Sequence, residues 1–315
     1  MNRKENYSTT YRAIFQSGMP SKVTWETSQA DIISEGRGFI GAFDYTLQLQ
    51  VGCPGGCLFC YVPAATRLTP TKVRGSKGEN WGFVVRNKEA VIAKLKKHLN
   101  SGRLADKTIY WSGVTDPYAA PPAITAELWE ILLGTPETLK PKRIVIQTRF
   151  RPDRDIELIS QYQKVTTPSD GGPPVLVSYS VGTDRNDLIQ AWEKSTPLFE
   201  HRMEAIAKLR QFDVFVVATL SPFCLWDDLV GTLRQFKARE VAYITCLFMK
   251  VNTMSANTPV GFVSYVRANY PELLDPKWQR GQLRVLQNIY GPERVLVGKR
   301  GFESLVNPHK VVNAV

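Results

Sequence analysis

The sequence predicts an α/β fold, a partial (β/α)6 TIM-type barrel with extensions at both ends. Two observations lead to this prediction. Segments rich in strand-forming residues alternate along the chain with segments whose apolar residues recur at helical spacing, which is typical of a parallel sheet covered by helices. The length of 315 residues is sufficient for one such barrel with a sizeable core.

The strands of the barrel are predicted in the first four-fifths of the chain. The alternating segment from Phe43 to Val51 is expected to form the first strand. Further segments with the branched and aromatic residues that favour strands are 108–112, 143–148, 175–181, 214–220 and 241–246.

Helices are predicted between the strands. Apolar residues spaced three or four apart indicate helices around 91–99, 128–132, 199–209 and 229–236. We expect Thr196 to cap the third of these and Pro197 to occupy its first position. The predicted barrel spans 38–250, preceded by an N-terminal extension (1–37) and followed by a C-terminal helical region (251–315) that packs on it.

Composition indicates a cytoplasmic protein with a basic surface. No apolar run approaches the roughly 18 residues of a membrane helix, and the N-terminus MNRKENYSTTYRA lacks the apolar run of a secretory signal. Lys and Arg exceed Asp and Glu by 11, and the segment 66–103 contains ten basic and two acidic residues. Because it also contains Trp81 and Phe83, this segment is a candidate surface for DNA or RNA. An ordinary solvated surface would have the same composition.

Three of the five cysteines lie close together in GCPGGCLFC, where Cys53, Cys57 and Cys60 form the pattern C-x3-C-x2-C. A closed zinc site needs four ligands, so zinc would require a distant fourth residue. Iron-sulfur clusters are held by cysteine thiolates. Three local thiolates would leave one iron of a cubane cluster open to a small molecule, so we favour the cluster.

The triad followed by an aromatic residue, Cys60-Tyr61, resembles the signature of the radical S-adenosylmethionine (SAM) superfamily. This resemblance implies a [4Fe-4S] cluster whose fourth iron is chelated by the amine and carboxylate of SAM. It also implies reductive cleavage of SAM to methionine and a 5'-deoxyadenosyl radical, an electron donor such as flavodoxin or ferredoxin, and a position for Tyr61 near the adenine.

Further SAM contacts are expected at the carboxyl ends of the strands, where barrel enzymes gather their chemistry. Hydroxyl and acidic side chains there suit the amine and ribose, and the Arg149 guanidinium suits a carboxylate. The candidates are Ser112, Thr115, Asp116, Arg149, Ser178 and Ser180.

From about Gly38 to Asn307 the chain resembles the branch that includes spore photoproduct lyase and relatives labelled DNA repair photolyase. The resembling segments are 43–45, 60–63, 115–118, 148–149, 177–180 and 197–210. The resemblance implies a cysteine near the end of the second strand that returns hydrogen to the product, and residues 110–113 contain none. Cys246, Cys224 and Tyr179 are the alternative candidates for this catalytic role.

The function that we expect is hydrogen abstraction from a substrate, with nucleic acid favoured because of the basic segment. Two alternatives remain open at this point. One is radical SAM modification of a small molecule or peptide. The other is a non-catalytic iron-sulfur protein that binds nucleic acid or senses redox state.

Overall fold

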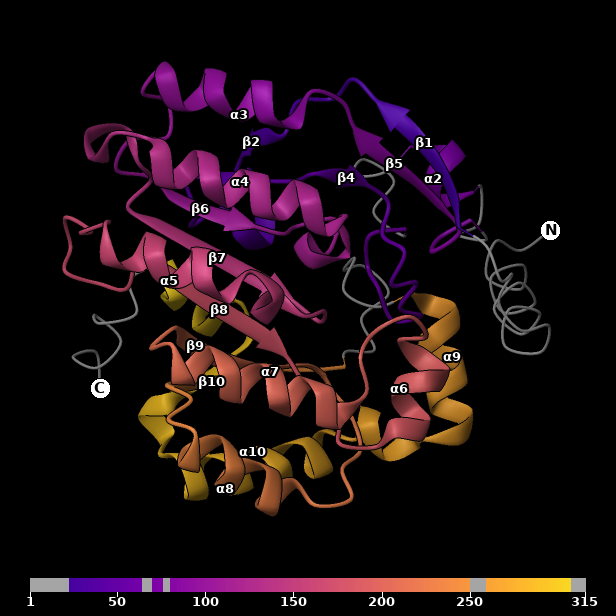
Figure 1. The fold of residues 1–315 in the computed structure, drawn as a ribbon. Coiled ribbons are helices and arrows are strands. Elements are labelled where there is room, and N and C mark those ends of the chain that lie inside the picture. Colours follow the sequence, from indigo (N-terminus) through magenta and orange to yellow (C-terminus); the bar gives the residue numbers. More distant parts are fainter. Residues whose placement is uncertain (1–22, 64–69, 76–79, 250–258, 307–315) are drawn as a thin grey trace.

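The computed structural model describes residues 23–63, 70–75, 80–249 and 259–306. Its main sheet has the strand order β11-β10-β9-β8-β7-β6-β3-β2 (Figure 1). Neighbouring strands in it are parallel except for the β2–β3 pair. These strands are β2 (Ile33–Glu35), β3 (Tyr45–Leu47), β6 (Thr108–Trp111), β7 (Arg143–Thr148), β8 (Val175–Ser180), β9 (Phe215–Phe223), β10 (Tyr243–Phe248) and β11 (Val295–Val297).

Helices lie between the strands along the chain. They are α3 (Val91–Asn100), α4 (Pro122–Gly134), α5 (Ile156–Lys164), α6 (Asn186–Trp192), α7 (Phe199–Gln211), α8 (Leu229–Ala238), α9 (Val260–Asn269) and α10 (Pro276–Tyr290). Of these, α3, α4, α5, α7 and α8 lie in a row across one side of the sheet, whereas α6 and α9 pack against each other away from that row (Figure 1). Strands and helices alternate as predicted, which confirms the α/β partial-barrel fold. None of these helices is long and apolar enough to cross a membrane, within the described parts of the chain.

The predicted first strand divides between two sheets. Its first part is β3, in the main sheet, whereas β4 (Gln50–Val51) pairs with β5 (Val84–Lys88) in a second sheet of order β1-β5-β4. Strand β1 (Thr24–Ser28) and the short helix α2 (Thr71–Arg74) complete this small unit. Strand β2 lies before residue 38 and β11 after residue 250, so the main sheet continues past both boundaries expected for the barrel.

The prediction that Thr196 caps α7 is wrong. The residue that precedes the helix is Leu198, which makes no side-chain capping bond. The hydroxyl of Thr196 instead donates to Glu193 Oε2 at 3.1 Å. It accepts from the Arg202 guanidinium at 2.7 Å and not from a backbone amide of the helix, as a cap would.

Two apolar cores lie on opposite faces of the main sheet. Ile144, Ile146 and their neighbours pack outward against the helices, whereas Tyr110, Val145 and equivalent residues face the barrel interior because side chains alternate along a strand. Helix α11 (Gly298–Glu303) closes the interior: the Phe302 ring packs edge-on against Tyr110 at 5.5 Å between centroids. Helix α11 therefore packs inside the barrel, against the inward-facing side chains of the sheet.

Candidate functional site

The three clustered cysteines lie on a loop that follows β4, which we call the cluster loop (52–60). Gly52 and Gly56 have left-handed backbone, with φ of +86° and +57°, which glycine adopts without strain. A Cβ on Gly52 would lie 2.7 Å from the carbonyl oxygen of Val84. The Leu58 amide donates to the Trp192 carbonyl at 2.8 Å, so the loop is fastened to the end of α6.

All three thiols line one cavity of about 250 Å³ at the carboxyl ends of the strands. Within the described residues, no three Cys, His, Asp or Glu side chains are placed to hold one metal ion. A [4Fe-4S] cluster takes each thiolate on a different iron, and a donor set of three thiols fits that group. Burial raises the pKa of Cys53 and of Cys60 to about 12. Binding of a cluster would therefore release protons from the thiols.

Most of the predicted SAM contacts lie on the wall of this cavity. Ser112, Thr115, Asp116, Arg149, Ser180 and Tyr61 line it. The Tyr61 hydroxyl donates to the Gly113 carbonyl at 2.5 Å, so the cluster loop reaches across to the end of β6. Ser178 does not line the cavity: it is fully buried, and its hydroxyl lies 2.5 Å from that of Thr219 inside the barrel.

The Asp116 carboxylate accepts hydrogen bonds from other groups of the protein. It accepts hydrogen bonds from the Thr148 hydroxyl at 2.6 Å, the Arg149 amide at 2.7 Å and the Tyr118 amide at 3.0 Å. Burial raises the pKa of this carboxyl, and the three bonds oppose that effect. Asp116 therefore joins the end of β7 to the segment that follows β6.

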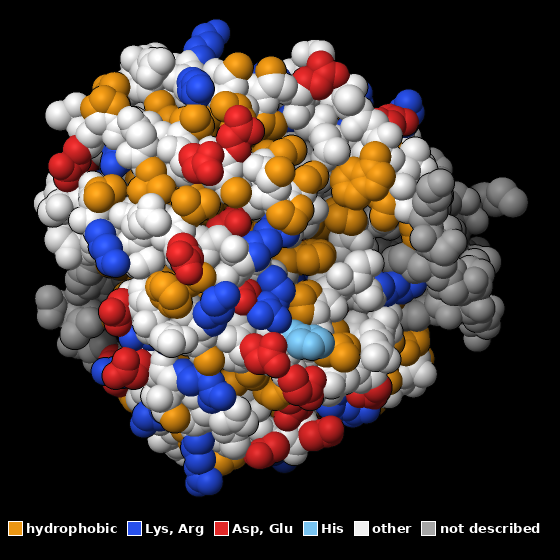
Figure 2. Space-filling view, viewed as in Figure 1, with side chains coloured by type: hydrophobic (Ala, Val, Ile, Leu, Met, Phe, Trp, Pro, Cys, Tyr) orange, Lys and Arg blue, Asp and Glu red, His pale blue; other side chains and the backbone are white. Residues whose placement is uncertain are grey.

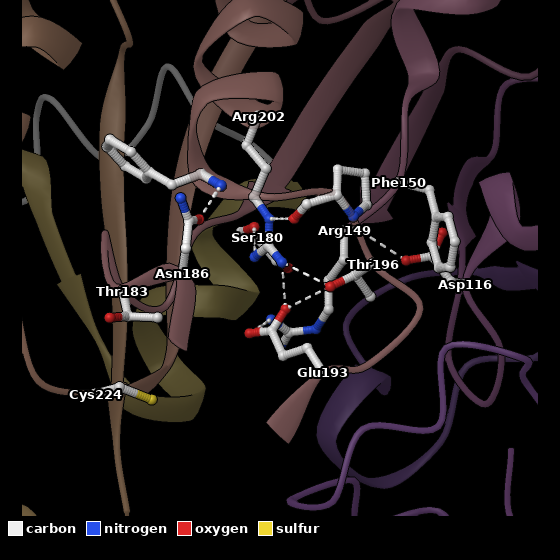
Figure 3. Close-up of polar contacts among 12 residues, drawn as sticks. Asp116, Arg149, Phe150, Ser180, Thr183, Asn186, Glu193, Thr196, Arg202 and Cys224 are labelled. Atoms are coloured by element: carbon white, nitrogen blue, oxygen red, sulfur yellow. Dashed lines mark hydrogen bonds and ion pairs between the residues drawn. The ribbon is translucent and has the colours of Figure 1, made fainter. Parts of the chain in front are cut away.

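Arg149 belongs to a buried charge network that the sequence analysis missed (Figure 3). It donates to Glu193 Oε1 at 3.1 Å. On the other side, Arg202 donates to Glu193 Oε2 at 2.5 Å and to the Thr196 hydroxyl at 2.7 Å. Glu193 and Arg202 are 2% and 0% exposed. The sequence does carry a signal for this network, because Arg202 falls on the apolar face of a predicted helix.

Comparison with solved structures identifies proteins that share this fold. No protein-family profile matches the chain, and no curated protein matches its sequence. A solved structure of spore photoproduct lyase in complex with dinucleoside spore photoproduct aligns over 94% of this chain and 85% of that one, with a TM-score of 0.53 and 13% identity. The chain has the fold of radical SAM enzymes.

A second radical SAM structure agrees with this result. The radical SAM methyltransferase TsrM from Kitasatospora setae, with tryptophan and a SAM analogue bound, aligns over 81% of this chain and 54% of that one, with a TM-score of 0.51 and 12% identity. Solved structures with this fold contain SAM with a dinucleoside photoproduct in one case, and cobalamin with a [4Fe-4S] cluster in another.

The three candidate hydrogen donors lie behind the wall of the cavity and do not line it. Cys246 and Tyr179 are fully buried in the core between sheet and helices. Cys224 belongs to the apolar cluster that contains Leu58 and Trp192. None of the three is among the residues of the cavity wall, whereas Tyr61 and Tyr110 are.

Aromatic side chains form much of the remaining wall. They are Phe59, Trp81, Tyr110, Phe150, Phe248 and Phe302. Trp81, which the sequence suggested as an exposed stacking residue, is only 7% exposed. The charged residues of the described wall are Asp116 and Arg149, and each is engaged by the chain itself. This part of the wall is therefore largely apolar.

The structure divides the basic segment 66–103. Arg67 and Lys77 lie outside the described residues. Helix α2, with Lys72 and Arg74, lies beside the cluster loop, because its Val73 side chain would meet a Cβ on Gly52 at 2.7 Å. Helix α3 runs back toward the amino ends of the strands. There Arg103 stacks on Tyr45, the first residue of β3, at 5.0 Å.

Some lysines of this segment are structural. Lys94 donates to the carbonyls of Gln29 and Ala30 at 3.0 Å each, and Lys88 donates to the carbonyl of Asp31. On the face shown in Figure 2, basic and acidic side chains are interspersed. The surface available to a polyanion is therefore smaller than the count of charges suggested.

Proposed function

We propose that the protein is a radical SAM enzyme that holds a [4Fe-4S] cluster through Cys53, Cys57 and Cys60. The observation that carries this proposal is that three thiols of a C-x3-C-x2-C loop share one cavity with polar strand-end residues. When reduced, the bound cluster and SAM supply a 5'-deoxyadenosyl radical that abstracts hydrogen from a substrate.

The side chains of the cavity have distinct parts in this proposal. Ser112, Thr115 and Ser180 line the cavity, where their hydroxyls can bind the polar groups of SAM. Tyr61 lines the same cavity. Arg149 offers its guanidinium to a carboxylate while Glu193 keeps it in place. The aromatic wall excludes water from a reactive species.

The test of this proposal is cleavage of SAM. The protein is reconstituted with iron and sulfide without oxygen, reduced with dithionite and mixed with SAM, and 5'-deoxyadenosine is measured. We expect product from the parent and from Cys224→Ala, and none from Cys57→Ala. A bound cluster without SAM cleavage would contradict the proposal and favour a non-catalytic iron-sulfur protein. The physiological electron donor that we propose is a flavodoxin or ferredoxin that docks near the cluster loop.

For the substrate we propose a nucleic acid, with an uncharged base entering the cavity. Support comes from the basic helix α2 beside the cluster loop and from the aromatic wall. The solved lyase structure with a dinucleoside photoproduct is a further reason. A base in a duplex would have to leave the stack to reach this cavity.

Two matched variants test the nucleic-acid proposal. Lys72→Ala, beside the cluster loop, is expected to weaken binding of DNA or RNA and to reduce its salt dependence by about one phosphate contact. Lys97→Ala, near the far end of α3, is expected to leave both unchanged. Equal effects, or no binding by the parent, would contradict this substrate and favour a small molecule or peptide. TsrM, which was solved with tryptophan bound, has the same fold.

A further inference from the structure

The buried chain Arg149–Glu193–Arg202 contains three charged groups and carries one net positive charge. Each arginine donates to a different oxygen of Glu193, at 3.1 and 2.5 Å. Arg202 also donates to the carbonyls of Ser180 at 3.2 Å and Pro197 at 2.8 Å. Arg149 donates in addition to the Ser221 carbonyl. Glu193 is the partner that the two arginines share, and removal of one partner from such a buried group leaves an uncompensated charge.

This charge chain borders the cluster loop on two sides. The Arg149 guanidinium lies 4.9 Å from the ring centre of Phe59, and Glu193 directly follows Trp192, whose carbonyl holds the Leu58 amide. Arg149 also lines the cavity together with Cys57 and Cys60, and Cys57 packs against the apolar cluster that contains Trp192. The buried charges of this chain therefore lie beside the proposed iron ligands, where solvent screens them little.

We propose that Glu193 is a positioning residue that holds Arg149 against the cluster loop and, through its charge, sets the reduction potential of the cluster. This inference rests on the proposed function. Reduction adds one negative charge to a cluster, so nearby positive charge raises its potential and nearby negative charge lowers it. Glu193 keeps the network at one net positive charge instead of two, and it thereby holds the potential low.

Glu193→Gln tests this inference because the substitution removes the charge and retains the size of the side chain. The reconstituted cluster is titrated at fixed potentials, and the reduced fraction is read from its electron paramagnetic resonance signal. We expect a rise of at least about 59 mV, which corresponds to a tenfold change for a one-electron couple. Glu204→Gln is the matched control, because Glu204 lies on α7 two residues after Arg202 and its side chain is 62% exposed. We expect it to leave the potential unchanged.

Arg202→Met is expected to shift the reduction potential in the opposite direction. Loss of this positive charge leaves Arg149 and Glu193 as a neutral pair, so the potential is expected to fall. Thr196→Val removes one hydrogen bond of Glu193 and no charge, and its potential is expected to stay at the parent value even where stability drops.

Each result supports or overturns the inference. A bound cluster with the same potential in Glu193→Gln and Glu204→Gln would overturn it and leave the proposed function intact. If Glu193→Gln does not fold, Arg202→Met decides, and an unchanged or higher potential in that variant would overturn the inference. Failure of the parent to bind a cluster would overturn both the inference and the proposed function.

Discussion

Replacement of Asp116 by alanine is expected to destabilise the protein more than the loss of any single hydrogen bond. The carboxylate serves three donors, namely the amides of Tyr118 and Arg149 and the hydroxyl of Thr148. Alanine leaves all three without an acceptor at the junction of two strand ends. Because Thr148 and Arg149 line the cavity, the same change would displace Arg149.

The magnitude follows from the cost of unpaired buried donors. Each costs about 1–3 kcal/mol, so Asp116→Ala is expected to lower the free energy of unfolding by roughly 3–9 kcal/mol, a large part of the 5–15 kcal/mol typical of a folded protein. Asp116→Asn keeps the acceptor Oδ1, which receives the bonds from Thr148 and Tyr118. It also removes a carboxyl group whose pKa is raised by burial. We expect a smaller loss, about 1 kcal/mol.

Urea unfolding at pH 7, followed by circular dichroism, measures these differences. Asp275→Ala is the control: Asp275 also accepts from two backbone amides, at 2.9 and 3.3 Å, but at an exposed helix start. Water can replace that carboxylate, so the cost is about 1 kcal/mol. Equal losses in Asp116→Ala and Asp275→Ala would refute the buried structural role of Asp116.

Three further predictions concern the cluster loop and the basic segment. Gly52→Ala forces a side chain into left-handed backbone 2.7 Å from a β5 carbonyl, so we expect a loss of at least about 2 kcal/mol in urea unfolding and less bound iron; parent-like values would contradict this. Lys94→Glu is expected to cost about 1–2 kcal/mol because two carbonyls lose their donor, whereas Lys96→Glu on the same helix stays within about 0.5 kcal/mol; equal urea midpoints would count against it. In metal-free protein burial raises the pKa of Cys53 and Cys60 to about 12. The rate of thiol alkylation should therefore be low at pH 8 and still increase with pH at pH 10, because the thiolate is the reactive form. A rate that stops increasing near pH 9 would contradict this.

The fold could be predicted from the sequence because its signals are local. Strand-forming segments and helical repeats occur in the order that the sheet requires, and each predicted strand has a counterpart in β3 or β6–β10. Helix α5 was missed, although Ile156, Ile159 and Tyr162 have helical spacing and are buried. Division of the first strand between two sheets depends on pairing with β5, a distant segment, which periodicity does not reveal.

The candidate site was predictable only where a motif or a strand end defined it. The thiols and most strand-end residues meet at one cavity, as parallel strands require. Ser178 was misplaced because, although it points to the same face of β8 as Ser180, it lies two residues before the end of the strand and bonds Thr219 inside the barrel. The role of Glu193 depends on Arg149, which directly follows β7, and on Arg202 of α7, so only the tertiary structure could show it.

The most direct test of the central claim is the electron paramagnetic resonance spectrum of the reduced, reconstituted protein with and without SAM. If three thiolates hold the cluster and one iron lacks a protein ligand, the protein contains about four irons per chain and its signal changes when SAM is added. A complete cluster whose signal is the same with and without SAM would contradict the account, because the fourth iron would then already have a ligand from the protein.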